Sequence, residues 1–93
     1  MYSVFYAKEV LEQDLPNILE PWKTEIRNAI EKKLAIKPMV YTRPLKRSLK
    51  GYRKLRVGEY RIVLRIEENN IVKVFAIQHR SKVYTTSPSR IQR

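Results

Sequence analysis

The chain has 93 residues, enough for one small domain with a single core, and it contains no cysteine, which excludes disulfides and thiolate metal sites. Twenty Lys and Arg residues against nine Asp and Glu residues give a net charge of +11, a balance typical of proteins that bind polyanions. A single histidine and the lack of any apolar run near the ~20 residues of a membrane span lead us to expect a cytoplasmic protein with no metal, cofactor or membrane segment.

The first 35 residues predict one strand and two helices. The aromatic and β-branched run from Tyr2 to Ala7 predicts a strand, and a short helix from Lys8 to Asp14 should end before Pro16. A longer helix is expected from Pro21 to Ala35, because its apolar residues recur at spacings of three and four. These are Trp22, Ile26, Ala29, Ile30 and Leu34. Trp22 fits this packed stripe better than the alternative role of a platform for a nucleobase.

Residues 36 to 51 are predicted to form an irregular basic connector. Pro38 and Pro44 interrupt regular structure, whereas Leu45 and Leu49 are suited to anchor the segment on the body. A disordered linker is the alternative. The ordered loop that we expect would extend the positive surface through Arg43, Lys46, Arg47 and Lys50.

The run from Tyr52 to Arg65 predicts a tight β-hairpin. Apolar and basic residues alternate with period two, and the pattern breaks once, at Gly58-Glu59, as a type II′ turn with Gly first would require. In this register Arg56 lies opposite Arg61. One face of the hairpin should carry Leu55, Val57, Tyr60, Ile62 and Leu64. The other should carry Tyr52, Lys54, Arg56, Arg61, Val63 and Arg65.

The basic face of this hairpin predicts an anionic ligand. Like charges that are directly opposed destabilise a sheet unless an anion lies between them, although cations also serve solubility and edge protection. The charge is also unevenly distributed, because residues 1 to 31 have three basic and six acidic side chains, a net of −3, which leaves +14 for the rest. Nucleic acid is the most common ligand of such a surface.

The last predicted elements are a polar turn, a buried strand and a polar end. Glu67 to Asn70 should form the turn, and Ile71 to Ile77 should form a central strand buried on both faces, followed by polar groups as far as Tyr84. The whole chain, residues 1 to 93, is then one α+β domain of order strand, helix, helix, strand, strand, strand. Two N-terminal helices should cover one face of a small, mainly antiparallel four-stranded sheet, and the basic face should stay open.

RNA cleavage without a metal requires a base for the 2′-hydroxyl, cations for the scissile phosphate and an acid for the leaving 5′-oxygen. Lysine, arginine and tyrosine suffice where clustered positive charges lower the pKa of a lysine. Two candidates with this chemistry lie on the open face of the predicted hairpin, and two come after the adjacent central strand. They are Lys54, Arg61, Arg80 and Tyr84.

At these residues the sequence resembles the RelE/ParE toxin superfamily of toxin–antitoxin systems, particularly the RelE branch. The resemblance spans almost the whole chain in element order. Its most specific segments are Pro44-Leu45, residues 49 to 52, residues 54 to 61 and residues 76 to 84. It implies a ribosome-dependent mRNA endonuclease that enters the ribosomal A site and cuts by 2′-hydroxyl attack, leaving a 2′,3′-cyclic phosphate.

The resemblance also implies roles for single residues. Lys54 matches the base, Arg61 the phosphate ligand, Arg80 an acid or second phosphate ligand, and Tyr84 an aromatic that stacks on the target base. Tyr52 or Arg53 stands where related enzymes often have a second lysine. The expected RNA contacts are Arg43, Lys46, Arg47, Lys50, Arg53, Arg56, Arg65, His79 and Lys82.

Alternatives remain for His79 and for the function. Beside Arg80, His79 is expected to be neutral and structural, although some relatives use a histidine as acid or base. The chain could instead belong to the ParE branch, which inhibits DNA gyrase and cuts no RNA, or be a non-catalytic RNA-binding module. Besides the ribosome and mRNA, we expect a separate acidic antitoxin that forms a heteromeric complex with this chain and covers its basic face, through an amphipathic helix.

Overall fold

The computed structural model describes residues 1–45, 51–79 and 81, which form a five-stranded sheet packed against helices. The strand order is β1-β5-β4-β3-β2, with β1 parallel to β5 and the other neighbours antiparallel. This confirms the α+β class and the mainly antiparallel sheet. The strands are β1 (Ser3–Tyr6), β2 (Arg43–Pro44), β3 (Arg53–Val57), β4 (Tyr60–Glu67) and β5 (Ile71–His79).

The predicted number of four strands is wrong, because part of the connector pairs with the hairpin. In β2, Arg43 lies opposite Lys54 and Pro44 opposite Arg53. Pro44 lacks a backbone N–H, which an edge strand tolerates since its outer side pairs with nothing in the sheet. The alternation of side chains that predicts a strand cannot be detected over two residues.

The helical segments also differ in detail from the prediction of two helices. The first helix consists of a π-helical turn, η1 (Val10–Asp14), and a 3₁₀ turn, η2 (Leu15–Asn17). The second is α1 (Trp22–Ala29), which continues without a break into the π-helical η3 (Ile30–Leu34) and so matches the predicted span. A further short helix, α2 (Pro38–Tyr41), was not predicted; Pro38 begins it, at a position where proline is favourable.

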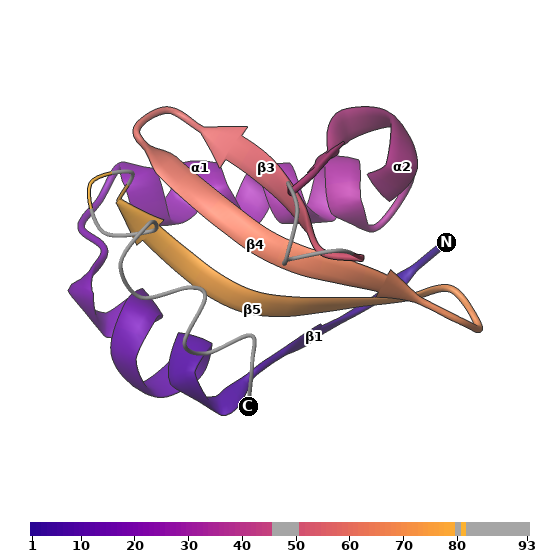
Figure 1. The fold of residues 1–93 in the computed structure, drawn as a ribbon. Coiled ribbons are helices and arrows are strands. Elements are labelled where there is room, and N and C mark those ends of the chain that lie inside the picture. The colour runs from indigo at the N-terminus through magenta and orange to yellow at the C-terminus, as the bar shows by residue number, and fades with distance from the viewer. Residues whose placement is uncertain (46–50, 80, 82–93) are drawn as a thin grey trace.

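The core lies between the helices and one face of the sheet. Figure 1 shows α1 running along this face behind β3 and β4. The buried side chains of the cluster are Val10, Ile18, Ile26, Ile30, Leu34, Leu55, Ile62, Leu64, Val72, Val74 and Ile77. Trp22 is an exception to the predicted stripe, because it is 37% exposed and packs over the hairpin turn rather than in the core.

The hairpin has the predicted register. Val57 lies opposite Tyr60 and Arg56 opposite Arg61, and Gly58 has a φ of 60° whereas Glu59 is not among the residues with positive φ, as a type II′ turn requires. The polar turn before β5 is also confirmed, since Asn69 and Asn70 have left-handed backbones with φ of 63° and 57°.

Strand β5 is internal, but the prediction that both of its faces are fully buried is wrong. Val72, Val74 and Ile77 face the helices, whereas Lys73 and His79 are exposed. The register shifts between Val63 and Leu64 of β4, a β-bulge. On the open face, a second small cluster consists of Val63 and Ala76 covered by Leu45 and Tyr52.

Asp14 ties the first helix to the sheet. Its carboxylate is buried, and Oδ2 accepts a hydrogen bond of 2.8 Å from the backbone N–H of Ile77. Strand β1 has ended by that point, with the last backbone bond from Ala7 to Val74. Asp14 therefore satisfies a donor of β5 that β1 does not reach. Within the described residues, no helix is both long and apolar enough to span a membrane.

Candidate nucleic-acid interface

A basic pocket lies at the edge of β3. Its volume is about 350 Å³, and five of its seven lining side chains are cations. No acidic side chain is found among the described residues that line it. The lining consists of Lys33, Tyr41, Arg43, Lys54, Leu55, Arg56 and Arg61.

The register of three strands assembles the cations. Arg43 of β2 lies opposite Lys54 of β3, and two residues further along β3, Arg56 lies opposite Arg61 of β4. Residues directly opposite in an antiparallel pair have Cβ atoms about 4.5–5.5 Å apart. Two opposed pairs of like charge thus lie side by side, an arrangement that a bound anion would stabilise.

The short length of β2 leaves the pocket accessible. It pairs only with Arg53 and Lys54, so among the strands that the structure describes, none pairs with the outer edge of β3 from Leu55 to Val57. The other wall comes from the helical layer, where the Lys33 ammonium lies 5.6 Å from the centre of the Tyr41 ring, a cation–π distance. Sequence reasoning missed both residues, because Lys33 resembles any lysine on the solvated side of a helix and Tyr41 belongs to no periodic pattern.

Two of the four predicted catalytic residues, Lys54 and Arg61, meet in this pocket together with the predicted RNA contacts Arg43 and Arg56. Both Lys54 and Arg61 are partly buried, which restricts their side chains more than those of exposed cations. Six further predicted site residues lie outside the described part of the chain. These are Lys46, Arg47, Lys50, Arg80, Lys82 and Tyr84.

Arg53, a predicted RNA contact, is held by the protein itself. Its Nε donates a hydrogen bond of 2.7 Å to Thr42 Oγ1, and its NH2 group donates one of 2.8 Å to the Thr42 carbonyl. Thr42 Oγ1 in turn donates to the carbonyl of Pro38 at 2.6 Å. Because Arg53 and Leu55 are two residues apart, they share the helix side of β3, opposite to the side of Lys54.

Two further predicted contacts lie away from the pocket. His79 is exposed at the end of β5, with its ring 5.6 Å from that of Tyr60 and Nδ1 3.1 Å from Ser81 Oγ. Arg65 forms an ion pair of 3.0 Å with Glu67 and lies 5.6 Å from the centre of the Tyr52 ring.

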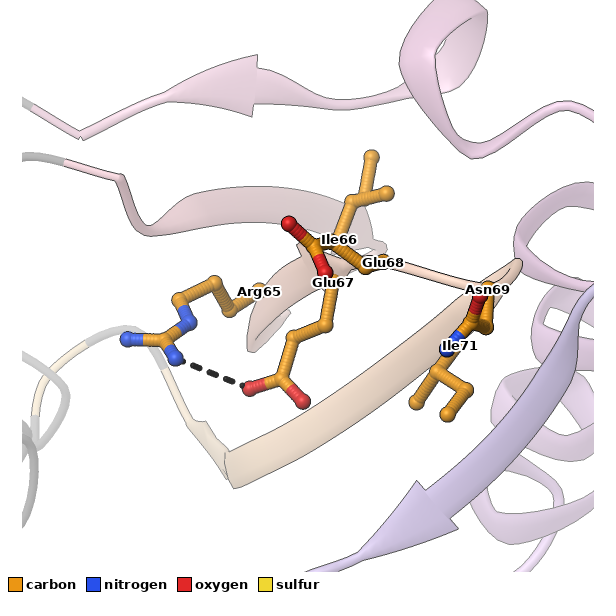
Figure 2. Close-up of a pocket in the computed structure, with 6 residues that line it drawn as sticks. All are labelled: Arg65, Ile66, Glu67, Glu68, Asn69 and Ile71. Carbon is orange, nitrogen blue, oxygen red and sulfur yellow. Dashed lines mark ion pairs between the residues drawn. The ribbon is translucent and has the colours of Figure 1, made fainter.

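Arg65 and Glu67 border a second, wider hollow of about 530 Å³ beside the turn before β5. Figure 2 shows the Arg65 guanidinium directed toward the Glu67 carboxylate, with Asn69 and Ile71 to one side of the pair. Because acidic and basic groups are paired here, this hollow lacks the uniform positive charge of the β3 pocket and does not suit a polyanion.

The β3 pocket can bind phosphate groups and present an amine to a neighbouring hydroxyl. Arginine supplies forked donors that fit phosphate oxygens, whereas lysine supplies a compact charge that also exchanges protons. The described residues contain no group of three or more His, Cys, Asp or Glu side chains placed to hold a metal ion.

Comparison with known proteins gives a match to one family model. The family is described as the ParE toxin of the type II toxin–antitoxin system parDE, and its model matches residues 6–84. A sequence search of curated proteins finds no significant match.

Several solved structures with the same fold are toxin–antitoxin complexes. The RelBE2 complex of Mycobacterium tuberculosis has a TM-score of 0.77 at 24% identity, covering 84% of this chain and 96% of that one. The RelB–RelE complex of Methanococcus jannaschii has a TM-score of 0.67 at 17% identity, covering 88% and 96%. The YoeB–YefM complex of Staphylococcus aureus has a TM-score of 0.59 at 18% identity, covering 85% and 97%. At these identities the likeness concerns the fold.

Proposed function

The chain belongs to the family of ParE toxins of type II toxin–antitoxin systems, and we propose that this toxin is a ribosome-dependent mRNA endoribonuclease. Membership of the RelE/ParE superfamily, implied by the sequence motifs, is thereby confirmed. The observation that carries the proposal is the β3 pocket, in which Lys54 and Arg61 lie among three further cations. A protein that acts on a phosphodiester needs such a concentration of positive charge at one point.

In the proposed reaction, Lys54 takes the proton of a ribose 2′-hydroxyl and the 2′-oxygen attacks the adjacent phosphorus. Arg61 and Arg56 bind the phosphate oxygens as negative charge develops on them. The bond from phosphorus to the 5′-oxygen breaks, and the leaving oxygen takes a proton from Arg80, while Tyr84 stacks on the target base. The products are a 2′,3′-cyclic phosphate and a 5′-hydroxyl, and no step uses a metal. The message is positioned for this attack in the ribosomal A site.

We also propose that a separately encoded acidic antitoxin holds this toxin inactive. Three of the similar solved structures are themselves described as complexes of a toxin with an antitoxin. Residues 32 to 93 carry a net charge of +14, which favours an acidic partner through long-range attraction.

A second candidate function is inhibition of DNA gyrase, because the matching family model is named for ParE rather than RelE. An inhibitor that acts by binding does not need a reactive lysine between arginines. The two functions therefore differ in their dependence on Lys54.

The test is translation in a cell-free system with purified protein, followed by primer extension on the message. Wild type should cut at the A-site codon only when ribosomes are engaged, and Lys54→Ala should lower the cutting rate at least about 100-fold, the usual scale for loss of a general base. Lys73→Ala is the matched control, since Lys73 is an exposed lysine of β5 that does not line the pocket. Equal cutting by wild type and Lys54→Ala contradicts the mechanism. No cutting, together with inhibited supercoiling by purified gyrase, supports the second candidate instead.

A further inference from the structure

The α2 turn exposes an unusual number of apolar side chains for so short a segment. Ile36, Met39, Val40 and Tyr41 are 47% to 70% exposed, four large apolar residues within six positions. Pro38 and Thr42 are buried beneath them and fix the turn to the body, and Arg53 adds its hydrogen bonds to Thr42. Figure 1 shows α2 standing out from the sheet beside β3. We refer to Ile36, Met39, Val40 and Tyr41 as the α2 patch.

The sequence around the α2 patch is strongly basic. From Lys32 to Gly58 the sequence has ten Lys and Arg residues and no Asp or Glu. Lys33 lies against the Tyr41 ring, Lys37 is an exposed residue within the segment, and Arg43 follows it. An apolar centre with a charged rim is the usual composition of a protein interface.

We propose that the α2 patch is the docking site of an acidic amphipathic segment of the partner protein, and that this segment closes the β3 pocket. This deepens the proposed function and depends on it, because the antitoxin is the partner concerned. Such a segment would place aliphatic side chains on the α2 patch and Asp or Glu side chains against Lys33, Lys37 and Arg43.

Charge decides between this occupant and two others. A second copy of the chain carries +11 and would be repelled by the rim, and residues 82–93 of the same chain contain three basic residues and no acidic one. RNA would be attracted by the cations and could stack on the Tyr41 ring, but the other three members of the α2 patch, Ile36, Met39 and Val40, offer no ring on which a base can stack. An acidic, aliphatic protein segment satisfies both the charge and the apolar surface.

The same contact would block the pocket through Tyr41. Tyr41 belongs to the α2 patch and also lines the β3 pocket. Lys33 and Arg43 beside it line the pocket as well. A segment seated on the α2 patch therefore covers one wall of the pocket and neutralises cations that RNA would need. Binding of the partner and binding of RNA should be mutually exclusive.

The probe is a designed helical peptide of about four turns with Leu and Ile on one face and Glu on its flanks. A matched peptide carries Lys in place of Glu. The Glu peptide should bind wild type and weaken as salt is raised, and the Lys peptide should not bind. Val40→Asp should weaken the Glu peptide at least about tenfold. The control Leu19→Asp alters a side chain that is 76% exposed outside the α2 patch, and it should change binding less than about twofold.

Four outcomes overturn the inference: no binding of the Glu peptide, equal binding of both peptides, equal effects of Val40→Asp and Leu19→Asp, or a loss of RNA-oligonucleotide binding in Val40→Asp that leaves peptide binding intact. Unchanged thermal unfolding shows that Val40→Asp is folded. In a competition assay, the Glu peptide should displace a ribo-oligonucleotide from wild type. Because the peptide assay involves no cleavage, its failure leaves the Lys54-dependent cutting of the proposed function untouched, and a failure to cut leaves the peptide result standing.

Discussion

Two neighbouring arginines of β3 have opposite surroundings, although both looked like RNA contacts in the sequence. Arg53 is partly buried and donates hydrogen bonds to Thr42, whereas Arg56 is exposed in the pocket opposite Arg61. Residue type alone did not separate them. Their positions in the strand separate them: Arg53 is odd-numbered and Arg56 even-numbered, and successive side chains of a strand point to opposite faces of the sheet.

Arg53→Met is expected to destabilise the protein by about 1–3 kcal/mol, since it leaves the buried Thr42 carbonyl and hydroxyl without their charged donor. Arg56→Met removes a cation that opposes Arg61 and should change the free energy of unfolding by less than about 0.5 kcal/mol. Chemical denaturation measures both. The assignment fails if Arg53→Met unfolds like wild type but loses RNA binding.

Tyr6 gives the fold a dependence on alkaline pH. Burial raises the pKa of the Tyr6 hydroxyl, the carboxylate of Glu31 adds to the rise, and Arg27 opposes it. Because folding raises the pKa of Tyr6, the neutral hydroxyl contributes fully to the stability of the folded protein below the ordinary tyrosine pKa of about 10. This contribution is lost as the pH rises through the pKa of Tyr6 in the folded state.

Tyr6→Phe should therefore lose less thermal stability than wild type between about pH 9 and about pH 11, because it has no hydroxyl to ionise. Tyr41→Phe removes the hydroxyl of an exposed tyrosine and serves as the control. This variant should lose as much thermal stability over this pH range as wild type does. An identical drop in Tm for wild type and Tyr6→Phe contradicts this explanation.

Among the elements, the hairpin of β3 and β4 follows most directly from the sequence. Its alternation is long, its turn is marked by Gly58, and a shift of one residue would have turned Leu55 and Ile62 toward solvent, so only one register was possible. The parallel contact of β1 with β5 had no such local sign, because it joins segments nearly 70 residues apart. Strand β2 and helix α2 were missed since two and four residues are too few to show a period.

In the candidate site, too, some residues could be predicted from local pattern and others could not. Lys54, Arg56 and Arg61 could be placed together from the hairpin alone, because the register fixes their relation. Lys33 and Tyr41 could not, since they reach the pocket through the packing of the helical layer on the edge of β3. Contacts between elements are set by tertiary packing and leave little trace in local pattern.

Gly58 connects the hairpin turn to the helix layer. Its φ of 60° is strained for any residue with a Cβ atom, and a Cβ added there would lie 2.7 Å from Cη2 of Trp22 and closer still to Cζ3. Gly51 has a φ of 90°, but no atom of the described residues lies within 4 Å of such a Cβ. A side chain added at either glycine would strain the backbone, but only one added at Gly58 would also clash with Trp22.

Gly58→Ala should cost about 1–3 kcal/mol more than Gly51→Ala, because only the former displaces a packed aromatic ring. Denaturant unfolding gives both values. In the background of Trp22→Ala the difference should largely disappear; if it persists, the turn rather than the ring is responsible.

For the whole molecule, the segregation of charge predicts the salt dependence of RNA binding. Each phosphate contacted on a single strand contributes a slope of about −0.7 to the logarithm of affinity against the logarithm of salt concentration. The five cations of the pocket thus set a limit of about −3.5 for the slope that the pocket supplies.

Arg56→Met should make the slope less steep by about 0.7, as one phosphate contact is lost. Lys73→Ala, which lies outside the pocket, should leave it unchanged. Fluorescence anisotropy of a labelled ribo-oligonucleotide at several salt concentrations measures these slopes. Equal slopes for the two variants would place the RNA elsewhere.

The parallel pairing of β1 with β5 also sets the order in which the fold can form during synthesis. Strand β1 leaves the ribosome first, but its partner β5, paired from Ser3 opposite Ile71 to Tyr6 opposite Val74, is the last of the described strands to be made. Since β5 also supplies Val72, Val74 and Ile77 to the core, the domain cannot close before these residues emerge. For most of the time that its message is being translated, the folded toxin therefore does not yet exist, whatever its target.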